Sequence, residues 1–175
     1  MYDVMDVSRF IINYCNDKGY FINTSKLEKI LYYVQALFII NENENEPCFD
    51  NDILAGEIGP FIPEISNAFK HFGTLAHIPP ITHYKGYFEK NLTPNDKEFY
   101  EVLEYKTKIS HKHQTDIQRM VDRLDKYSWL SLSYASKKEQ PYINAANSYS
   151  KIIAHKDIYD YFMSKNQEET PSPSR

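Results

Sequence analysis

Apolar residues recur at helical spacing near the start of the chain. Val7, Phe10, Ile11 and Tyr14 fall on one face of a helix. Asp6 stands where it can cap the start of that helix, and a glycine at position 19 suits a left-handed C-cap. The pattern therefore predicts a first helix that ends near residue 18.

A second and longer apolar stripe predicts the spine of the core. Its members are Leu27, Ile30, Leu31, Val34, Leu37 and Phe38. Asn23 or Thr24 can accept hydrogen bonds from the first free amides of this helix. Lys26, Glu28 and Lys29 begin the opposite face, which we expect to be polar.

The middle of the chain predicts a loop, a turn and a short helix. Residues 41–52 read NENENEPCFDND, which is typical of a solvated loop. Residues 53–62 are apolar but are broken by Gly56, Gly59 and Pro60, so they form a short strand or an extended segment that ends in a turn. Pro63 fits the first turn of a helix, which Gly73 ends.

The second half continues the helical pattern. Residues 74–90 are irregular and predict a loop, with a short strand around 81–88. Thr93 and Pro94 suit the start of a helix in which Phe99, Val102 and Leu103 face inward. Further helices are expected after Ser128, in a short turn from Pro141, and over residues 114–126 and 156–163. The apolar faces of the last two are formed by Ile117, Met120, Val121 and Leu124, and by Ile158, Tyr161 and Phe162. The fold class is therefore mainly α: one compact domain of about seven helices over residues 1–165, with at most a small β-hairpin. Residues 166–175 are expected to be a disordered polar tail.

Composition narrows the class of protein. The net charge of −4 disfavours a dedicated nucleic-acid binder, which usually carries a basic excess. Cys15 and Cys48 are too few for a disulfide framework or a zinc site, and Cys15 lies in an apolar helical pattern that predicts burial. The 15 tyrosines and 10 phenylalanines suit either the boundary of a core or a protein-binding face. No apolar stretch is long enough for a membrane span, so we expect a cytoplasmic protein.

Signs of catalysis are weak. The histidines are scattered or lie two residues apart, a spacing that does not gather metal ligands on a helix. They are His71, His77, His83, His111, His113 and His155. The sequence contains neither a glycine-rich phosphate loop nor a G-x-S-x-G motif. We therefore expect no enzyme, no catalytic residue, no metal and no cofactor.

Three segments, in this order, resemble one family. They are the opening helix from Tyr2 to Cys15, the segment KLEKILYYVQA at residues 26–36, and the segment GPFIPEI at residues 59–65. Together they are similar to the Panacea domain, also described as SocA-like or phage-associated GepA-like. The resemblance covers most of residues 2–163 and implies an antitoxin of a bacterial or phage toxin–antitoxin pair, which binds and silences a cognate protein toxin.

The matching motifs supply the candidate partner-binding or fold-motif residues: Lys29, Tyr32, Tyr33, Gln35, Glu57, Gly59, Pro60, Pro63 and Glu64. The two adjacent tyrosines cannot share one helix face, so one is expected to pack inward and the other to lie at the border, where it and Gln35 either line a groove or are purely structural. The negative charge of Glu64 is favoured in the first turn of a helix, and its carboxylate could also contact a partner, Tyr32 or Lys29. The family pattern is not followed at Gly56, Glu57, Ser66 and Tyr142, so the partner or the contact chemistry differs from the family's if these positions touch the partner.

Two other functions stay open at this point. Basic residues interleaved with tyrosines between Lys106 and Lys138 would suit a nucleic-acid-binding regulator, although the acidic residues among them dilute the charge. They would equally suit the steering of an acidic toxin. The chain could also be an adaptor that delivers a client protein to a protease.

Overall fold

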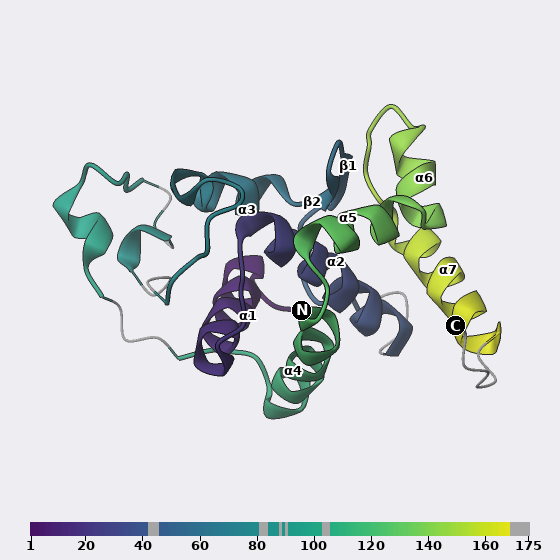
Figure 1. Ribbon diagram of the computed structural model, residues 1–175, viewed down its shortest axis with the longest axis horizontal. Coiled ribbons are helices and arrows are strands. Elements are labelled where there is room, and N and C mark those ends of the chain that lie inside the picture. Colours follow the sequence, from purple (N-terminus) through teal and green to yellow (C-terminus); the bar gives the residue numbers. More distant parts are fainter. Residues whose placement is uncertain (42–45, 81–83, 88, 90, 103–105, 169–175) are drawn as a thin grey trace.

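Helix α2 (Thr24–Asn41) lies at the centre of the molecule, and helices α1, α3, α4, α5 and α7 pack around it (Figure 1). The computed structural model describes residues 1–41, 46–80, 84–87, 89, 91–102 and 106–168. Within these ranges the further elements are α1 (Val4–Lys18), β1 (Leu54–Gly56), β2 (Gly59–Phe61), α3 (Pro63–Ala68), α4 (His111–Asp125), α5 (Trp129–Lys137), α6 (Gln140–Ala146) and α7 (His155–Glu168). Single 3₁₀ turns span Lys70–Phe72, Lys85–Tyr87 and Lys97–Tyr100. The predicted mainly α class with a small hairpin is confirmed.

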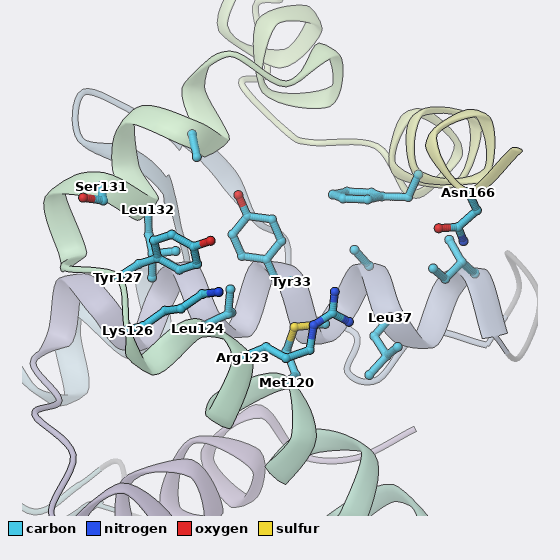
Figure 2. Close-up of a pocket in the computed structure, with 14 residues that line it drawn as sticks. Tyr33, Leu37, Met120, Arg123, Leu124, Lys126, Tyr127, Ser131, Leu132 and Asn166 are labelled. Carbon is cyan, nitrogen blue, oxygen red and sulfur yellow. The ribbon is translucent and has the colours of Figure 1, made fainter. Parts of the chain in front are cut away.

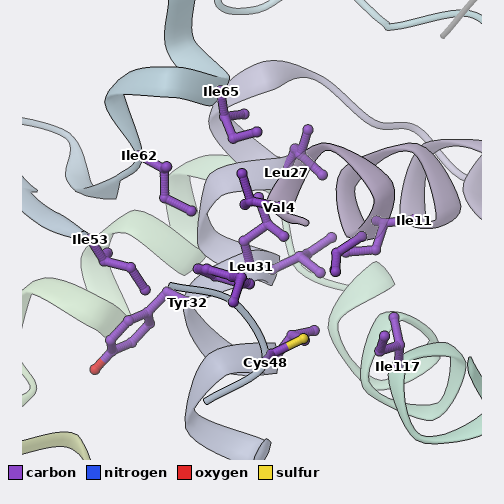
Figure 3. Packing of buried hydrophobic residues seen from close by; sticks show 14 of the residues in the cluster. Val4, Ile11, Leu27, Leu31, Tyr32, Cys48, Ile53, Ile62, Ile65 and Ile117 are labelled. Carbon is purple, nitrogen blue, oxygen red and sulfur yellow. The ribbon is translucent and has the colours of Figure 1, made fainter. Parts of the chain in front are cut away.

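The core forms where α1, α2, the hairpin, α3 and α4 meet (Figure 3). Leu27, Leu31 and Tyr32 of α2 are each fully buried in it. Cys15 of α1 is buried as predicted, and the left-handed Gly19 ends that helix at a φ of 73°. Asp3, three residues before the expected Asp6, caps α1, because its carboxylate accepts hydrogen bonds from the amides of the first turn.

The polar face predicted for α2 is wrong. Lys26, Glu28 and Lys29 are between 0% and 4% exposed, because neighbouring elements cover the helix on every side at this level. The Lys26 ammonium donates to the backbone carbonyl of Asp125 at 3.0 Å, and the Ser66 hydroxyl donates to Glu28. A central helix can bury charged side chains when such partners stand beside it.

The segment around the hairpin is more ordered and more buried than its sequence indicates. Cys48 and Phe49 are fully buried, although they fall in the stretch predicted as a solvated loop. The hairpin pairs Leu54 with Phe61 across an antiparallel register, and Pro63 then occupies the first turn of α3 as predicted. β1 also meets a segment near the C-terminus, since the Ala55 amide donates to the Lys151 carbonyl at 2.8 Å.

The prediction of a helix from Thr93 and Pro94 is wrong. The Asp96 carboxylate accepts from the Thr93 amide at 2.7 Å and closes a local turn, after which a 3₁₀ turn runs from residue 97 to 100. Phe99 is buried as expected, but Val102 is 66% exposed. In the strand predicted over residues 81–88, Tyr84 forms an isolated bridge with Val102, and a 3₁₀ turn replaces the strand from residue 85 to 87. His83, Leu103 and the other half of that predicted strand lie outside the described residues. Residues 169–175 of the predicted tail also lie outside the described residues. Residues 166–168, predicted as the start of that tail, are instead the last residues of α7.

Candidate functional site

The two adjacent tyrosines of α2 converge on one carboxyl group. Tyr32 is fully buried and Tyr33 is half-buried, so one packs inward and the other lies at the border, as predicted. Their hydroxyls donate to the two carboxylate oxygens of Glu139, at 2.8 Å from Tyr32 and 2.9 Å from Tyr33. Glu139 directly precedes α6, so this cluster ties the last part of the fold to the central helix.

Burial sets the protonation of this cluster. The desolvation of Glu139 raises its pKa to about 7, even though the two tyrosine hydroxyls favour the ionised form. Burial and the nearby carboxylate raise the pKa of both tyrosines. Near neutral pH the carboxyl therefore exchanges a proton while the tyrosines stay protonated.

Gln35 organises the chain that follows α2. Its side-chain oxygen accepts from the Cys48 amide at 2.9 Å, and its side-chain nitrogen donates to the Phe49 carbonyl at 2.9 Å. The same nitrogen lies 3.1 Å from the His155 ring at the start of α7. Gln35 is fully buried, so its contacts are with the protein's own backbone and with His155.

Lys29 lies under the hairpin and is also fully buried. Its ammonium is 3.9 Å from a carboxylate oxygen of Glu28 and has no hydrogen-bond acceptor among the described residues. Burial lowers the pKa of Lys29 to about 8, and burial likewise raises the pKa of Glu28. A β-carbon added at Gly59 would stand 3.1 Å from the Lys29 Cε, so the backbone approaches the lysine closely here.

Side chains of α5 and α6 donate hydrogen bonds to backbone carbonyls at the tip of the hairpin. The Ser133 hydroxyl donates to the Ile58 carbonyl at 2.5 Å, and the Tyr142 hydroxyl donates to the Gly56 carbonyl at 2.6 Å. The Lys137 ammonium donates to the Glu57 carbonyl at 2.7 Å. Glu57 is therefore fixed through its backbone, while its side chain belongs to an exposed residue.

The remaining motif residues shape the entry to α3. Gly59 adopts a φ of 103°, and both Gly59 and Pro60 are buried. Pro63 is exposed in the first turn of α3, and Glu64 beside it accepts a hydrogen bond from the Asn51 side chain. The structure thus brings Lys29 and Gly59 together, whereas Tyr33, Glu57 and Pro63 lie at separate places on the surface.

A groove of about 680 Å³ opens where α2, α4, α5 and α7 meet (Figure 2). Of the predicted site residues, Tyr33 lines it. Met120, Arg123 and Leu124 contribute the α4 side, and Phe162 contributes the α7 side. The sequence pattern marked Met120 and Leu124 as an inward helix face, but nothing in it indicated that this face borders an opening shared with α7.

Four basic residues of the second half take part in different contacts. Arg119 is 3.8 Å from Asp116, and Lys137 is engaged with the hairpin. Arg123 and Lys126 line the groove instead. These four cations are therefore divided between a pair on α4, the hairpin and the groove.

Two further observations concern ligands and membranes. Among the described residues, no three histidine, cysteine or acidic side chains are placed to hold a metal ion together. In the same part of the chain, no helix combines the length and apolar character that crossing a bilayer requires.

Comparison with known proteins assigns the family. A family model described as the SocA-like antitoxin Panacea domain matches residues 27–143. No curated protein and no solved structure matches the chain. The matched region runs from the first turn of α2 into α6 and includes the hairpin, Glu139 and most of the groove. Because the match covers more than half of the sequence, the chain belongs to the SocA-like Panacea domain family of antitoxins.

Proposed function

We propose that this protein is an antitoxin that binds a cognate protein toxin and holds it in an inactive complex. The match of the family model to residues 27–143 carries this proposal. We place the pair in the cytoplasm of a bacterium, encoded by the bacterium or by a phage. The mode of action is binding, and no chemical step on the toxin is required.

The distribution of polar groups supports a binding function. Most polar side chains of the family motifs are occupied inside the fold: Gln35 holds the chain after α2, and Tyr32 and Tyr33 donate to Glu139. The open surface near α2 is instead apolar and aromatic. Tyrosine, methionine and arginine, which line the groove, are enriched at protein interfaces.

Expression in bacteria tests the proposal. The product of the gene next to this one is expressed alone, together with this protein, and together with this protein carrying a stop codon in α2. We expect growth arrest in the first and third cultures and rescue in the second, and we expect the two proteins to copurify.

A harmless neighbouring product that never binds this chain would contradict the proposal. Rescue that requires a functional protease, with faster loss of the toxin when this protein is present, would instead identify an adaptor. Comparing the toxin half-life in protease-deficient and wild-type cells separates plain inhibition from delivery.

A further inference from the structure

The open stripe of α2 is the first sign of a docking surface. Four residues of this helix are not buried, and three of them line the groove at helical spacing: Tyr33, Leu37 and Ile40. All three are large and apolar. A helix that is otherwise enclosed therefore presents one uncovered apolar line, where the α4 and α7 side chains stand apart (Figure 2).

The apolar surface continues past the rim of the groove onto α5. Ser131 and Ala135 of α5 face the groove. Next to them Leu130 is 48% exposed and Tyr134 is 64% exposed, and Tyr127 at the start of this wall is 44% exposed. Large exposed apolar side chains that adjoin one another mark interaction sites more often than chance placement does.

The charge at the groove has one sign. Among the described residues that line it, Arg123 and Lys126 are cationic and none is acidic. No carboxylate of the described residues lies within ion-pair distance of Arg123. The Lys126 ammonium lies 5.1 Å from the centre of the Tyr127 ring. Two cations over an apolar floor complement an acidic apolar segment, whereas the same groove of a second copy would place like charges against each other and a nucleic acid would need more cations.

We propose that this groove is the docking site for an amphipathic segment of the toxin, which places apolar side chains on the Tyr33–Leu37–Ile40 stripe and a carboxylate against Arg123 and Lys126. The inference rests on the proposed antitoxin function and adds the site and the chemistry of the partner segment. The groove volume of about 680 Å³ suits several side chains of one segment rather than a whole domain.

Two substitutions test the groove, each with a matched control. Ala135→Trp fills the groove from its exposed wall, and Ala154→Trp places the same bulk at an exposed position that does not line it. Arg123→Glu reverses the groove charge, and Arg119→Glu makes the same change on α4 outside the groove. Thermal unfolding of the four variants first establishes that each one folds.

The binding probe is the purified product of the neighbouring gene. We expect both controls to bind it as the wild type does, and both groove variants to bind at least about tenfold more weakly, the loss that a single charged contact commonly supplies. Changing the contacting acidic residue of the neighbouring product to lysine is expected to restore binding to Arg123→Glu.

The other outcomes each overturn the inference in a distinct way. Equal binding by all four variants removes the groove and leaves the antitoxin function standing. Failure of the wild type to bind the neighbouring product removes both proposals. If light scattering finds a wild-type dimer that Ala135→Trp converts to a monomer, the groove is a self-association surface and the toxin docks elsewhere.

Discussion

At the scale of single residues, two opposing effects act on the pKa of the Glu139 carboxyl group. The hydroxyls of Tyr32 and Tyr33 stabilise its ionised form, while burial destabilises that form more strongly. The unfolded chain exposes the same carboxyl to water, where it releases its proton at a lower pH. Folding therefore holds a proton on Glu139 over a range in which the unfolded chain has lost it.

This difference predicts how stability depends on pH. Because the folded pKa is raised from 4.5 to about 7, the contribution of Glu139 is fully present below pH 4.5 and is lost as the pH rises to about 7. Glu139→Gln keeps the size of the side chain and removes the proton exchange. Urea unfolding at pH 5 and pH 8 is expected to show a smaller difference in unfolding free energy for Glu139→Gln than for the wild type.

The exposed Glu57 provides the control for this experiment. Glu57→Gln is expected to retain the full wild-type difference between the two pH values. An unchanged pH dependence in Glu139→Gln would mean that Glu139 is already ionised in the folded protein at pH 5.

Lys29 has the opposite effect at higher pH. Its folded pKa is lowered from 10.5 to about 8, so the unfolded chain binds more protons between these values and stability gains from rising pH there. Lys29→Met removes this gain. The unfolding free energy of wild type minus that of Lys29→Met is expected to increase from pH 8 to pH 10. A constant difference would show that the ammonium reaches water in the folded state.

At the scale of elements, the hairpin between β1 and β2 depends on one glycine. Gly59 combines a φ of 103° with close approach to the Lys29 side chain and to the hydroxyls of Ser133 and Ser136. Side chains with a β-carbon are strained in this backbone region, and the neighbours here belong to two different helices, α2 and α5.

Two alanine substitutions separate strain from crowding. Gly19 also has a positive φ, of 73°, but no atom lies within 4 Å of an added β-carbon. Gly19→Ala is expected to cost about 1–2 kcal/mol of unfolding free energy from backbone strain alone. Gly59→Ala is expected to cost clearly more, as measured by urea unfolding. Equal losses would mean that Lys29 and the serines yield to the added methyl group.

Elements were predictable from the sequence where one physical signal dominated. Asn23 caps α2, Ser128 caps α5, and Pro63 begins α3, because caps and prolines act through the nearest backbone groups. Thr93 and Pro94 carry the same local signal, yet the Thr93 hydroxyl donates to the Asp96 carboxylate at 2.8 Å, and the Asp96 amide closes a turn on the Thr93 carbonyl. The burial of Cys48 and Phe49 was not predictable, since it depends on Gln35, which precedes them in the chain and holds their backbone.

At the scale of the whole molecule, the sequence predicts the helices but not their neighbours. Periodicity identified Met120 and Leu124 as an inward face of α4, and Phe162 as part of an apolar face of α7. Periodicity does not show that these faces leave Tyr33, Leu37 and Ile40 uncovered. The groove forms at this uncovered part of α2. The polar face assigned to Lys26, Glu28 and Lys29 failed for the same reason, because enclosure of α2 is a property of all surrounding elements.

The hydrophobic core extends beyond the region that the family model matches. Val4, Val7 and Ile11 of α1 and Ile153 and Ile158 near the C-terminus are buried in the same core as α2, and all lie outside residues 27–143. A fragment of residues 27–143 is therefore expected to lack a cooperative thermal transition, whereas residues 1–168 retain it. Circular dichroism during heating measures both. A sharp transition in the shorter fragment would mean that α1 and α7 are accessory.

The pairing of β1 with the stretch around Ile152 has a consequence for synthesis in the cell. The Ala55 amide donates to the Lys151 carbonyl at 2.8 Å, so the hairpin finds its outer neighbour only after almost all of the domain has been translated. Until that stretch leaves the ribosome, one edge of the nascent hairpin stays without its partner strand and α2 stays without the cover of α7. An mRNA that encodes both this chain and the toxin proposed above would therefore protect the cell best when this chain is translated first.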